Sequence, residues 1–513
     1  MNRSINALLG LSATLFFPFV SHSQITSSPN VIFIYADDLG KGMLSVYGQK
    51  NFTTPNIDKL FNKGIAFEQA YGCMLSAPAR ASMLTGYHDC RNDKWNINGG
   101  AQFVNFTEET DIIRTEQQID ANDLLLPPND LYLAQVFKKA GYVTAEIGKL
   151  EWGFTASRNQ MRAHGWDYYY GYLDHVRCHG YYPPYLFENG KIVRIEGNTR
   201  KDCGKSIEQE TPQTYADRWD MTGKKTYSQD LFLGKILSFI NMHRNEPFFL
   251  YHPTQLPHGP VAIPAIHPEL EKNAELTPIE KEYGSMVKML DDQVGVIMNE
   301  LERLGIANNT VIVFASDNGH EIYYSQKNRC EKPYRNLITG KLFDDYNDKY
   351  YSTLSGDPFN GNAGMAGLKR SNLQGGVNIP LAIYWKDHLD TQKNNQVVAA
   401  YDLLVTAADA FGVDAGDEKD GVSLLPLFQK GARLASDRYV VFGSNYGPAI
   451  VMNDGWKLRY YKEKKVYELY NLNDDPRETT DLSVENSTKA EQLKKLLLEA
   501  CKGDIDNGIN RVG

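Results

Sequence analysis

A serine, an arginine and the start of a helix come together in the segment 76–86, which reads SAPARASMLTG. Pro78 suits the first turn of a helix, because the N–H that proline lacks would have no partner there, and Gly86 suits the end. Such a helix places Ser76 at its N-terminus, where free N–H groups and the dipole favour an anion. Arg80 lies on the same face and adds a fixed positive charge. The segment indicates a hydroxyl that attacks a phosphate or sulfate group, or else an ordinary helix start with Ser76 as its cap.

Acidic side chains directly follow two apolar runs of the kind that form buried strands. Those runs are 31–36 and 310–315. Asp37 and Asp38 come after the first run, and Asp317 and Asn318 come after the second. Each side chain alone could cap a helix or belong to a turn. Together they would set three carboxylates and an amide at one edge of a sheet, a site for a hard divalent cation with calcium preferred to magnesium.

Three basic side chains occupy comparable positions. Lys149 follows the apolar run 142–147, and His258 lies shortly after the run 247–251. Lys369 precedes a Gly-Gly pair. A lone lysine or histidine is usually solvated or satisfied by hydrogen bonds, but ligands of open α/β sheets bind beyond the carboxyl ends of the strands. These three side chains are therefore candidates for binding an anion at that edge.

Taken in order, these segments resemble the site segments of type I sulfatases. The family signature, C/S-x-P/A-x-R followed by T-G, matches the chain from Ser76, whereas Cys73 lies outside that frame. Asp-Asp, Gly-Lys, Pro-His, Asp-Asn-Gly and Lys-Arg before Gly-Gly match the remaining segments, and the likeness runs from about residue 29 to the C-terminus. The aromatic stretch 165–172 and the neighbourhood of His179 are similar to the carbohydrate-acting members.

The resemblance implies a fold, a modified residue and a cofactor. The fold is the alkaline-phosphatase-like α/β fold, a mixed sheet sandwiched by helices with a smaller C-terminal antiparallel-sheet subdomain. Ser76 would be oxidised to formylglycine by a formylglycine-generating maturase that accepts serine, which in this family implies a bacterial source; a serine that replaces a natural cysteine is the alternative. One Ca²⁺, rather than Mg²⁺, would be held by Asp37, Asp38, Ser76, Asp317 and Asn318.

The resemblance also assigns catalytic roles. Arg80 and Lys149 would hold the formylglycine hydrate and the sulfate. His258 and Lys369 would bind the sulfate and assist the leaving oxygen, with His258 as the acid because its ordinary pKa lies near neutral. His179 would reach the substrate. A hydrate has a second hydroxyl that expels the bound sulfate, which an unmodified serine lacks.

Three residues depart from the family pattern. Glu151 stands where many sulfatases have histidine, and Gln374 and Asn378 stand where Glu and Arg are usual. A carboxylate near a sulfate is unfavourable unless Glu151 pairs with Lys149 or turns away. The two amides are expected behind the site rather than in contact with substrate.

Strand-like and helix-like runs alternate through most of the chain, which predicts a parallel sheet covered on both faces. Beyond the apolar runs named above, helices are expected at 56–63, 131–140, 229–243 and 280–304. The tail has four short strand-like runs separated by turns and then a helical run, 489–501, which predicts an antiparallel sheet. The segment 328–364 is expected to be a long loop. The predicted division is a signal peptide (1–23), a catalytic domain (24–432) and a C-terminal α+β subdomain (433–513).

Composition narrows the class of protein. The chain has 513 residues and a net charge of −9, which argues against nucleic-acid binding. The N-terminus carries a positive charge, an apolar stretch and small residues, as in a secretory signal, and no other segment suggests membrane insertion. We therefore expect a protein exported to the periplasm or exterior of a bacterium. Export permits disulfides, but the pairing of six cysteines is not determined by the sequence.

Three functions remain open at this point. The favoured one is hydrolysis of the sulfate esters of a carbohydrate, with galactose or N-acetylgalactosamine sulfates as candidate substrates. A phosphoester hydrolase of the same superfamily would use unmodified Ser76, commonly with two zinc ions and several histidine ligands. A non-catalytic glycan-binding protein on a sulfatase scaffold would account for Glu151 and the unmodified serine.

Overall fold

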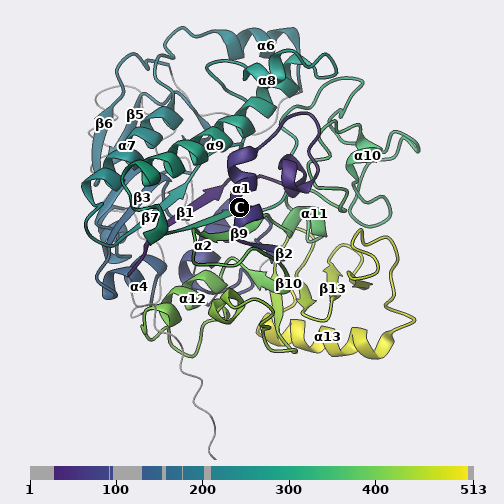
Figure 1. Cartoon of the computed structure of the whole chain (residues 1–513). Coiled ribbons are helices and arrows are strands. Elements are labelled where there is room, and N and C mark those ends of the chain that lie inside the picture. Colours follow the sequence, from purple (N-terminus) through teal and green to yellow (C-terminus); the bar gives the residue numbers. More distant parts are fainter. Residues whose placement is uncertain are drawn as a thin grey trace, which may run out of the picture.

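A ten-stranded mixed sheet forms the centre of the molecule (Figure 1). The computed structural model describes residues 28–91, 93–95, 97, 130–152, 157–175, 177–200 and 209–506, so the predicted signal peptide lies outside the described residues. The order across the sheet is β10 (Gln392–Ala399), β2 (Ile65–Tyr71), β9 (Leu381–Trp385), β8 (Thr310–Ser316), β1 (Asn30–Ala36), β7 (Phe248–Pro253), β3 (Val143–Lys149), β4 (Tyr168–Tyr172), β5 (Tyr185–Glu188) and β6 (Lys191–Arg194). The run from β8 to β4 is parallel, whereas β9, β5 and β6 are antiparallel to their neighbours. The α/β class with a mixed sheet, implied by the resemblance, is confirmed. The parallel sheet predicted from the alternation of strands and helices is wrong at β9, β5 and β6, which pair antiparallel.

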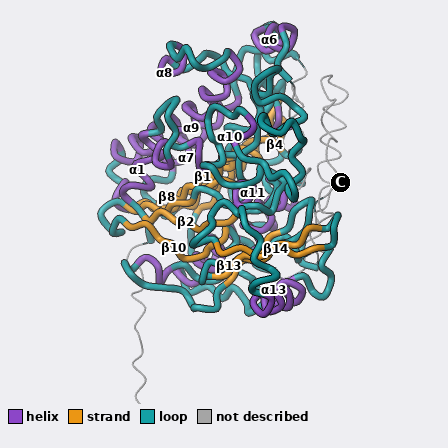
Figure 2. The backbone as a smooth tube through the Cα atoms, turned by 90° about the vertical axis from the view of Figure 1, so that its right-hand side faces the viewer, coloured by secondary structure: helices purple, strands orange, loops and turns teal. Residues whose placement is uncertain are grey.

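Helices cover both faces of the sheet because its central strands are apolar on both sides (Figure 2). In β1, Ile32 and Ile34 belong to one core, and Phe33 and Tyr35 belong to the other. The first core is closed by α1 (Pro55–Lys63), α7 (Ser228–Met242) and α9 (Pro278–Arg303). The second core is closed by α2 (Ser76–Thr85), α4 (Leu133–Lys139) and α12 (Asp402–Ala410). The helices predicted at 56–63, 131–140, 229–243 and 280–304 are confirmed, with ends that differ by a few residues.

The strands that sequence patterns missed lie on both sides of the four predicted ones. On one side they are β2, β9 and β10, and on the other β4, β5 and β6. The edge strand β10 reads QKNNQVVA, and its exposed first half carries polar side chains instead of an apolar run. A strand at an edge needs no second buried face, so its sequence has a weaker strand pattern.

A second sheet of four antiparallel strands lies in the C-terminal region. Its strands are β11 (Tyr439–Phe442), β12 (Ala449–Met452), β13 (Trp456–Tyr461) and β14 (Val466–Asn471). One face packs against α13 (Ser487–Ala500) through Leu493 and Leu497. The four strands and the final helix agree with the sequence prediction, while the domain boundary at residue 433 stays a prediction.

The remaining elements are short. They are α5 (Arg158–Ala163), α6 (Pro212–Trp219), α8 (Pro268–Glu271), α10 (Ser352–Ser355), α11 (Gln374–Val377) and the 3₁₀ helices Lys41–Met43, Ser45–Tyr47, Arg177–His179, Ala307–Asn309 and Leu425–Phe428. Only α10 interrupts the expected loop 328–364 among these described elements. The described cysteines, Cys73, Cys90, Cys178, Cys330 and Cys501, are all buried, and Cys203 lies outside the described residues. Within the described residues, every helix is too short or too polar to cross a bilayer.

A buried ion pair ties the second sheet to the loops beside the main one. Lys457 on β13 lies 2.6 Å from the carboxylate of Glu478, and both side chains are fully buried. The other carboxylate oxygen of Glu478 accepts a hydrogen bond of 2.6 Å from the backbone N–H of Gln374, the first residue of α11. Burial lowers the pKa of Lys457 to about 8, against the opposing effect of Glu478. The pair therefore fixes the position of α11 relative to the C-terminal sheet.

Replacing Lys457 with methionine should lower the free energy of unfolding by about 3 kcal/mol, because the Glu478 carboxylate stays buried without its partner charge. Urea denaturation followed by tryptophan fluorescence measures the loss. Lys464→Met, at an exposed lysine between β13 and β14, is the matched control and should change stability by less than about 0.5 kcal/mol. Equal stability of the two variants would contradict a structural role for the buried pair.

Candidate active site

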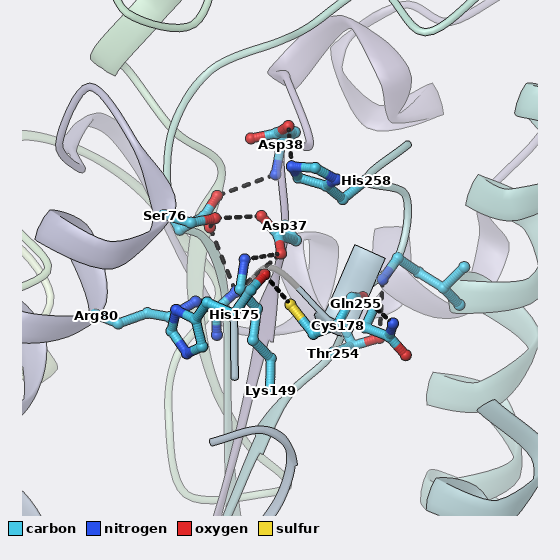
Figure 3. A network of polar contacts seen from close by, with 12 residues as sticks. Asp37, Asp38, Ser76, Arg80, Lys149, His175, Cys178, Thr254, Gln255 and His258 are labelled. Carbon is cyan, nitrogen blue, oxygen red and sulfur yellow. Dashed lines mark hydrogen bonds and ion pairs between the residues drawn. The ribbon is translucent and has the colours of Figure 1, made fainter. Parts of the chain in front are cut away.

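Three neighbouring strands deliver the predicted polar residues to one edge of the sheet (Figure 3). Asp37 and Asp38 directly follow β1, and Asp317 and Asn318 directly follow β8, which pairs with β1 in parallel. Lys149 is the last residue of β3, which lies one strand beyond β7 on the other side of β1. The parallel register thus brings together residues that are far apart in the sequence, as expected for the carboxyl ends of parallel strands.

Ser76 is the first residue of α2 and lies between two carboxylates. Its hydroxyl is within hydrogen-bond distance of Asp37 and Asp317. The chain before the helix passes close to β8, since a Cβ on Gly72 would lie 2.1 Å from the carbonyl oxygen of Asp317. Gly86 ends the helix in the left-handed conformation with φ of 77°. The predicted helix is confirmed, and a glycine at each end lets it sit against the acidic edge.

The proton count around Ser76 shows that negative charge is crowded there. One hydroxyl carries one proton, so it can donate to only one of the two carboxylates at a time. Burial and the neighbouring Asp37 raise the pKa of Asp317 to about 7, despite the opposing charge of Arg80. The cluster therefore either retains a proton at neutral pH or takes up a cation in its place.

Three permanent cations compensate the carboxylates. Arg80 Nη2 lies 3.3 Å from Asp317 Oδ2 and 3.5 Å from Asp37 Oδ2. Lys149 Nζ lies 2.8 Å from Asp37 Oδ2, and Lys369 Nζ lies 2.7 Å from Asp38 Oδ2. Burial favours a higher pKa for Asp37, but Lys149, His258, Arg80 and Lys369 outweigh it and hold that pKa well below its usual range. Asp37 is therefore ionised across the whole neutral range.

The predicted histidines form a stacked pair beside Lys369. The rings of His179 and His258 are parallel with centroids 4.3 Å apart. His258 Nδ1 lies 2.6 Å from the carbonyl oxygen of Gly259, which favours the tautomer with the proton on Nδ1 and leaves Nε2 as an acceptor, 3.3 Å from Lys369 Nζ. Burial and the charge of Lys369 lower the pKa of His258 to about 4, below the near-neutral value assumed from the sequence.

The side chains fit an oxygen-binding cation. Ligand atoms of Asp37, Asp38 and His258 all lie within 4.8 Å of one another. The amide nitrogen of Asn318 donates to Asp38 at 2.7 Å, while its buried oxygen has no hydrogen-bond partner among the described residues. An unpartnered oxygen beside crowded carboxylates is what a hard cation such as Ca²⁺ would satisfy. The nitrogen of His258 is a poorer ligand for calcium and already faces Lys369, so the predicted oxygen set fits better.

Two site residues had no signal in the sequence analysis. Tyr323 donates its hydroxyl proton to Asp38, and its ring centroid lies 5.0 Å from that of His258. His175 lies beside Lys149 and Arg80 (Figure 3), and burial followed by those two charges keeps its pKa well below the ordinary value. Tyr323 lies in an irregular segment after β8 and His175 in one after β4, where no periodicity predicts a direction for the side chain.

Glu151, which stands where many sulfatases have histidine, turns away from the anion site. Its carboxylate accepts the indole N–H of Trp166 at 2.6 Å and lies 2.6 Å from His164 Nδ1. Its backbone N–H donates to Glu146 at 2.8 Å, and its φ of 58° directs the side chain out of the path of β3. The sequence allowed Glu151 either to pair with Lys149 or to turn away from the sulfate, and the structure shows that it turns away.

The two amides of the Gly-Gly segment form a neutral pair behind the site. Asn378 donates to the side-chain oxygen of Gln374 at 2.9 Å, and Gln374 donates to the hydroxyl of Tyr71 at 3.1 Å. This hydrogen bond joins the two positions where Glu and Arg are usual in the family. Cys73, which does not fit the signature frame, is buried with its Sγ 3.4 Å from Ser82 Oγ.

Comparison with known proteins agrees with this geometry. The family model "Sulfatase" matches residues 29–413, and the model "N-sulphoglucosamine sulphohydrolase, C-terminal" matches residues 368–503. The N-acetylgalactosamine-6-O-sulfatase of Bacteroides thetaiotaomicron is 25% identical over 93% of this chain and 94% of its own. The N-acetylgalactosamine-6-sulfatase of Rattus norvegicus is 28% identical over 79% of this chain and 66% of its own. The crystal structure of Ps i-CgsB in complex with k-i-k-neocarrahexaose superposes with a TM-score of 0.67 at 23% identity, covering 94% of each chain.

The contacts of Glu151 predict its effect on stability. Glu151→Ala should lower the free energy of unfolding by about 1–3 kcal/mol, because the buried indole N–H of Trp166 loses its acceptor. Glu151→Gln keeps a carbonyl oxygen for that N–H and should lose less. Denaturant unfolding of both variants measures the difference. A carboxylate that instead served Lys149 would give similar losses for both, since either change removes its charge.

Proposed function

Because this chain belongs to the sulfatase family and is a sulfuric ester hydrolase, we propose that it removes sulfate from sulfated carbohydrates of the galactose and N-acetylgalactosamine type, using a formylglycine made from Ser76. The observation that carries the proposal is the position of the Ser76 hydroxyl. It lies between Asp37 and Asp317 at a helix start, with Arg80 and Lys149 on the same carboxylates. The substrate class rests on the two N-acetylgalactosamine sulfatases that the chain resembles over most of its length.

The cations of the site suit a singly charged sulfate ester. Arg80 approaches Asp37 from α2 and Lys149 approaches it from β3, so an anion bound next to Ser76 would be held between them. Calcium held by Asp37, Asp38, Asp317, Asn318 and residue 76 would add positive charge that stabilises the negative charge developing on the sulfate oxygens. Formylglycine supplies a hydrated aldehyde, one hydroxyl of which attacks sulfur while the other later releases the sulfate.

The proton for the leaving sugar oxygen comes from the Lys369–His258 pair. When the bond between sulfur and the sugar oxygen breaks, that oxygen takes up one proton and the sugar leaves as an alcohol. Lys369 carries protons 3.3 Å from His258 Nε2, and the imidazole of His258 is neutral in the free site. A bound sulfate ester brings negative charge next to this pair and raises the pKa of His258. Substrate binding therefore favours protonation of His258, the acid that the reaction needs.

We also propose that the protein is exported and matured in a bacterium. The apolar N-terminal stretch with its small-residue end is typical of a secretory signal, and a maturase that accepts serine would convert Ser76 before or during export. Two alternatives remain as outcomes of the test. They are a phosphoester hydrolase with unmodified Ser76 and a glycan-binding protein without turnover. Among the described residues His258 is the one histidine with a ligand atom within 4.8 Å of those of Asp37 and Asp38, which disfavours a two-zinc phosphatase site with several histidine ligands.

The modification itself tests the proposal. Protein purified from its native host should yield a peptide containing residue 76 that is lighter than the serine form by about 2 Da, the mass of the two hydrogens removed in oxidation. Peptide mass spectrometry makes the measurement, and the same peptide from a heterologous host without the maturase is the control. An unmodified serine in the native host would reject the formylglycine mechanism and leave the phosphatase and binding alternatives.

Calcium binding should depend on the protonation of Asp317. Because its pKa is about 7 without metal, Ca²⁺ must displace a proton below that pH, and the apparent affinity should fall about tenfold for each unit of pH below 7. Above pH 7 the affinity should level off. Isothermal titration of the metal-free protein with Ca²⁺ measures this directly.

Removal of the Asp317 carboxylate should abolish the binding of calcium. Asp317→Ala should lose measurable calcium affinity and the hydrolysis of sulfated sugars together. Asp454→Ala, at a turn beside β13 in the second sheet, is the matched control and should retain both. Wild-type turnover in Asp317→Ala would contradict the metal assignment.

A further inference from the structure

Arg370, whose side chain is partly exposed, is the residue directly after the buried Lys369 of the site. Arg370 comes after Lys369, and the backbones of both residues are fixed to the site. Lys369 donates its N–H to the carbonyl of His320 at 2.9 Å, and Arg370 donates its N–H to the carbonyl of Met74 at 3.0 Å. Met74 lies two residues before Ser76, so the arginine is anchored to the segment that carries the nucleophile.

Exposure separates this arginine from the cations already described. The side chains of Lys149 and Lys369 are only 2% and 4% exposed, whereas that of Arg370 is 39% exposed. A sulfate group is small enough to reach the buried lysines, but the sugar that carries it is not. The sugar must therefore lie on the solvent side of Lys369, and Arg370, the next residue along the chain, has a partly exposed side chain paired with Glu321.

Glu321 holds the arginine in one orientation. Its carboxylate lies 2.5 Å from Arg370 Nη1 and is 4% exposed, and its other oxygen accepts the N–H of Ile322 at 3.0 Å. Glu321 lies two residues before Tyr323, whose hydroxyl contacts Asp38, so the ion pair is connected to the acidic cluster. Among the described residues Glu321 is the side chain that Arg370 hydrogen-bonds, so other N–H groups of its guanidinium remain available to a ligand.

We propose that Arg370, oriented by Glu321, binds the ring hydroxyls of the sugar next to the sulfate ester and thereby selects the sugar. The inference rests on the proposed sulfatase function and names a binding contact for its substrate. The charge of Glu321 neutralises that of Arg370, so the pair suits neutral hydroxyls, which can donate to the carboxylate and accept from the guanidinium. A second sulfate or a carboxylate on the sugar would meet the negative charge of Glu321 and gain less.

A comparison of two substrate types tests this role. The kcat/KM of each variant is measured with N-acetylgalactosamine 6-sulfate and galactose 6-sulfate, and with 4-nitrophenyl sulfate, which has no ring hydroxyls. Arg370→Ala should lower kcat/KM for the sugar sulfates about 10- to 100-fold more than for the aryl sulfate, because charge-assisted hydrogen bonds to the sugar are lost. Arg433→Ala, at an exposed arginine outside the site, is the matched control and should leave both rates unchanged.

Two further variants separate binding from positioning. Arg370→Lys keeps the charge but not the planar fork and should recover only part of the preference for sugars. Glu321→Gln leaves Arg370 in place but less firmly oriented, so it should raise KM for the sugar sulfates with little change in kcat. Equal losses on sugar and aryl sulfates in Arg370→Ala would overturn the proposal. A loss confined to sugars with a second sulfate would also overturn it.

A binding measurement distinguishes this inference from the proposed function. In a Ser76→Ala background, isothermal titration with N-acetylgalactosamine 6-sulfate gives Kd without turnover, and adding Arg370→Ala should raise Kd about 10-fold or more. If the mature wild-type enzyme hydrolyses neither substrate type, the proposed function fails whatever this titration shows. If it hydrolyses only the aryl sulfate and the Kd is the same with and without Arg370, catalysis stands and the sugar-binding role of Arg370 is wrong.

Discussion

Three buried carboxylates beside one hydroxyl are the constraint that the rest of the site satisfies. Asp37, Asp38 and Asp317 sit at the ends of two adjacent parallel strands, where water cannot screen their repulsion. Such a group of charges is strongly unfavourable unless each one has a partner. Arg80, Lys149 and Lys369 each contact a different part of it, and the raised pKa of Asp317 shows that these three cations do not complete the compensation. The remaining deficit is what a divalent cation would fill.

The sheet topology converts this electrostatic requirement into a binding site. Each compensating cation comes from a different element: Arg80 from α2, Lys149 from β3 and Lys369 from the segment before α11. The two apolar cores on either face of β1 hold α2 and β3 without any charged contact, whereas the segment before α11 is also tied by the buried Lys457–Glu478 pair. Because the cores fix the strands, the cations would keep their positions if an anion or a metal bound, as preorganised electrostatic sites require.

The sequence predicted the parts of this arrangement that follow from strand ends. An apolar run that stops at an acid, as at Ala36 and Asp37, gives both the strand and the residue at its carboxyl end. The direction of Glu151 could not be predicted, since it depends on where His164 and Trp166 lie after α5 has packed. The pair Glu321–Arg370 was missed for a similar reason. Its members are far apart in the chain, in irregular segments, and only the folded backbone brings them together.

In the proposed mechanism, the lowered pKa of His258 would link substrate binding to catalysis. In the free site, burial and the charge of Lys369 keep the imidazole of His258 neutral. With its ordinary pKa, the same imidazole would be partly protonated near neutral pH. Lys369 and Lys149, which help to hold Asp37 ionised, therefore also oppose protonation of His258. In the proposed mechanism a sulfate ester that entered the site would add negative charge beside His258 and raise its pKa, when the leaving oxygen needs a proton. A neutral sugar without sulfate would lack that charge and would leave the imidazole neutral, so the charge on the substrate would decide when the acid forms.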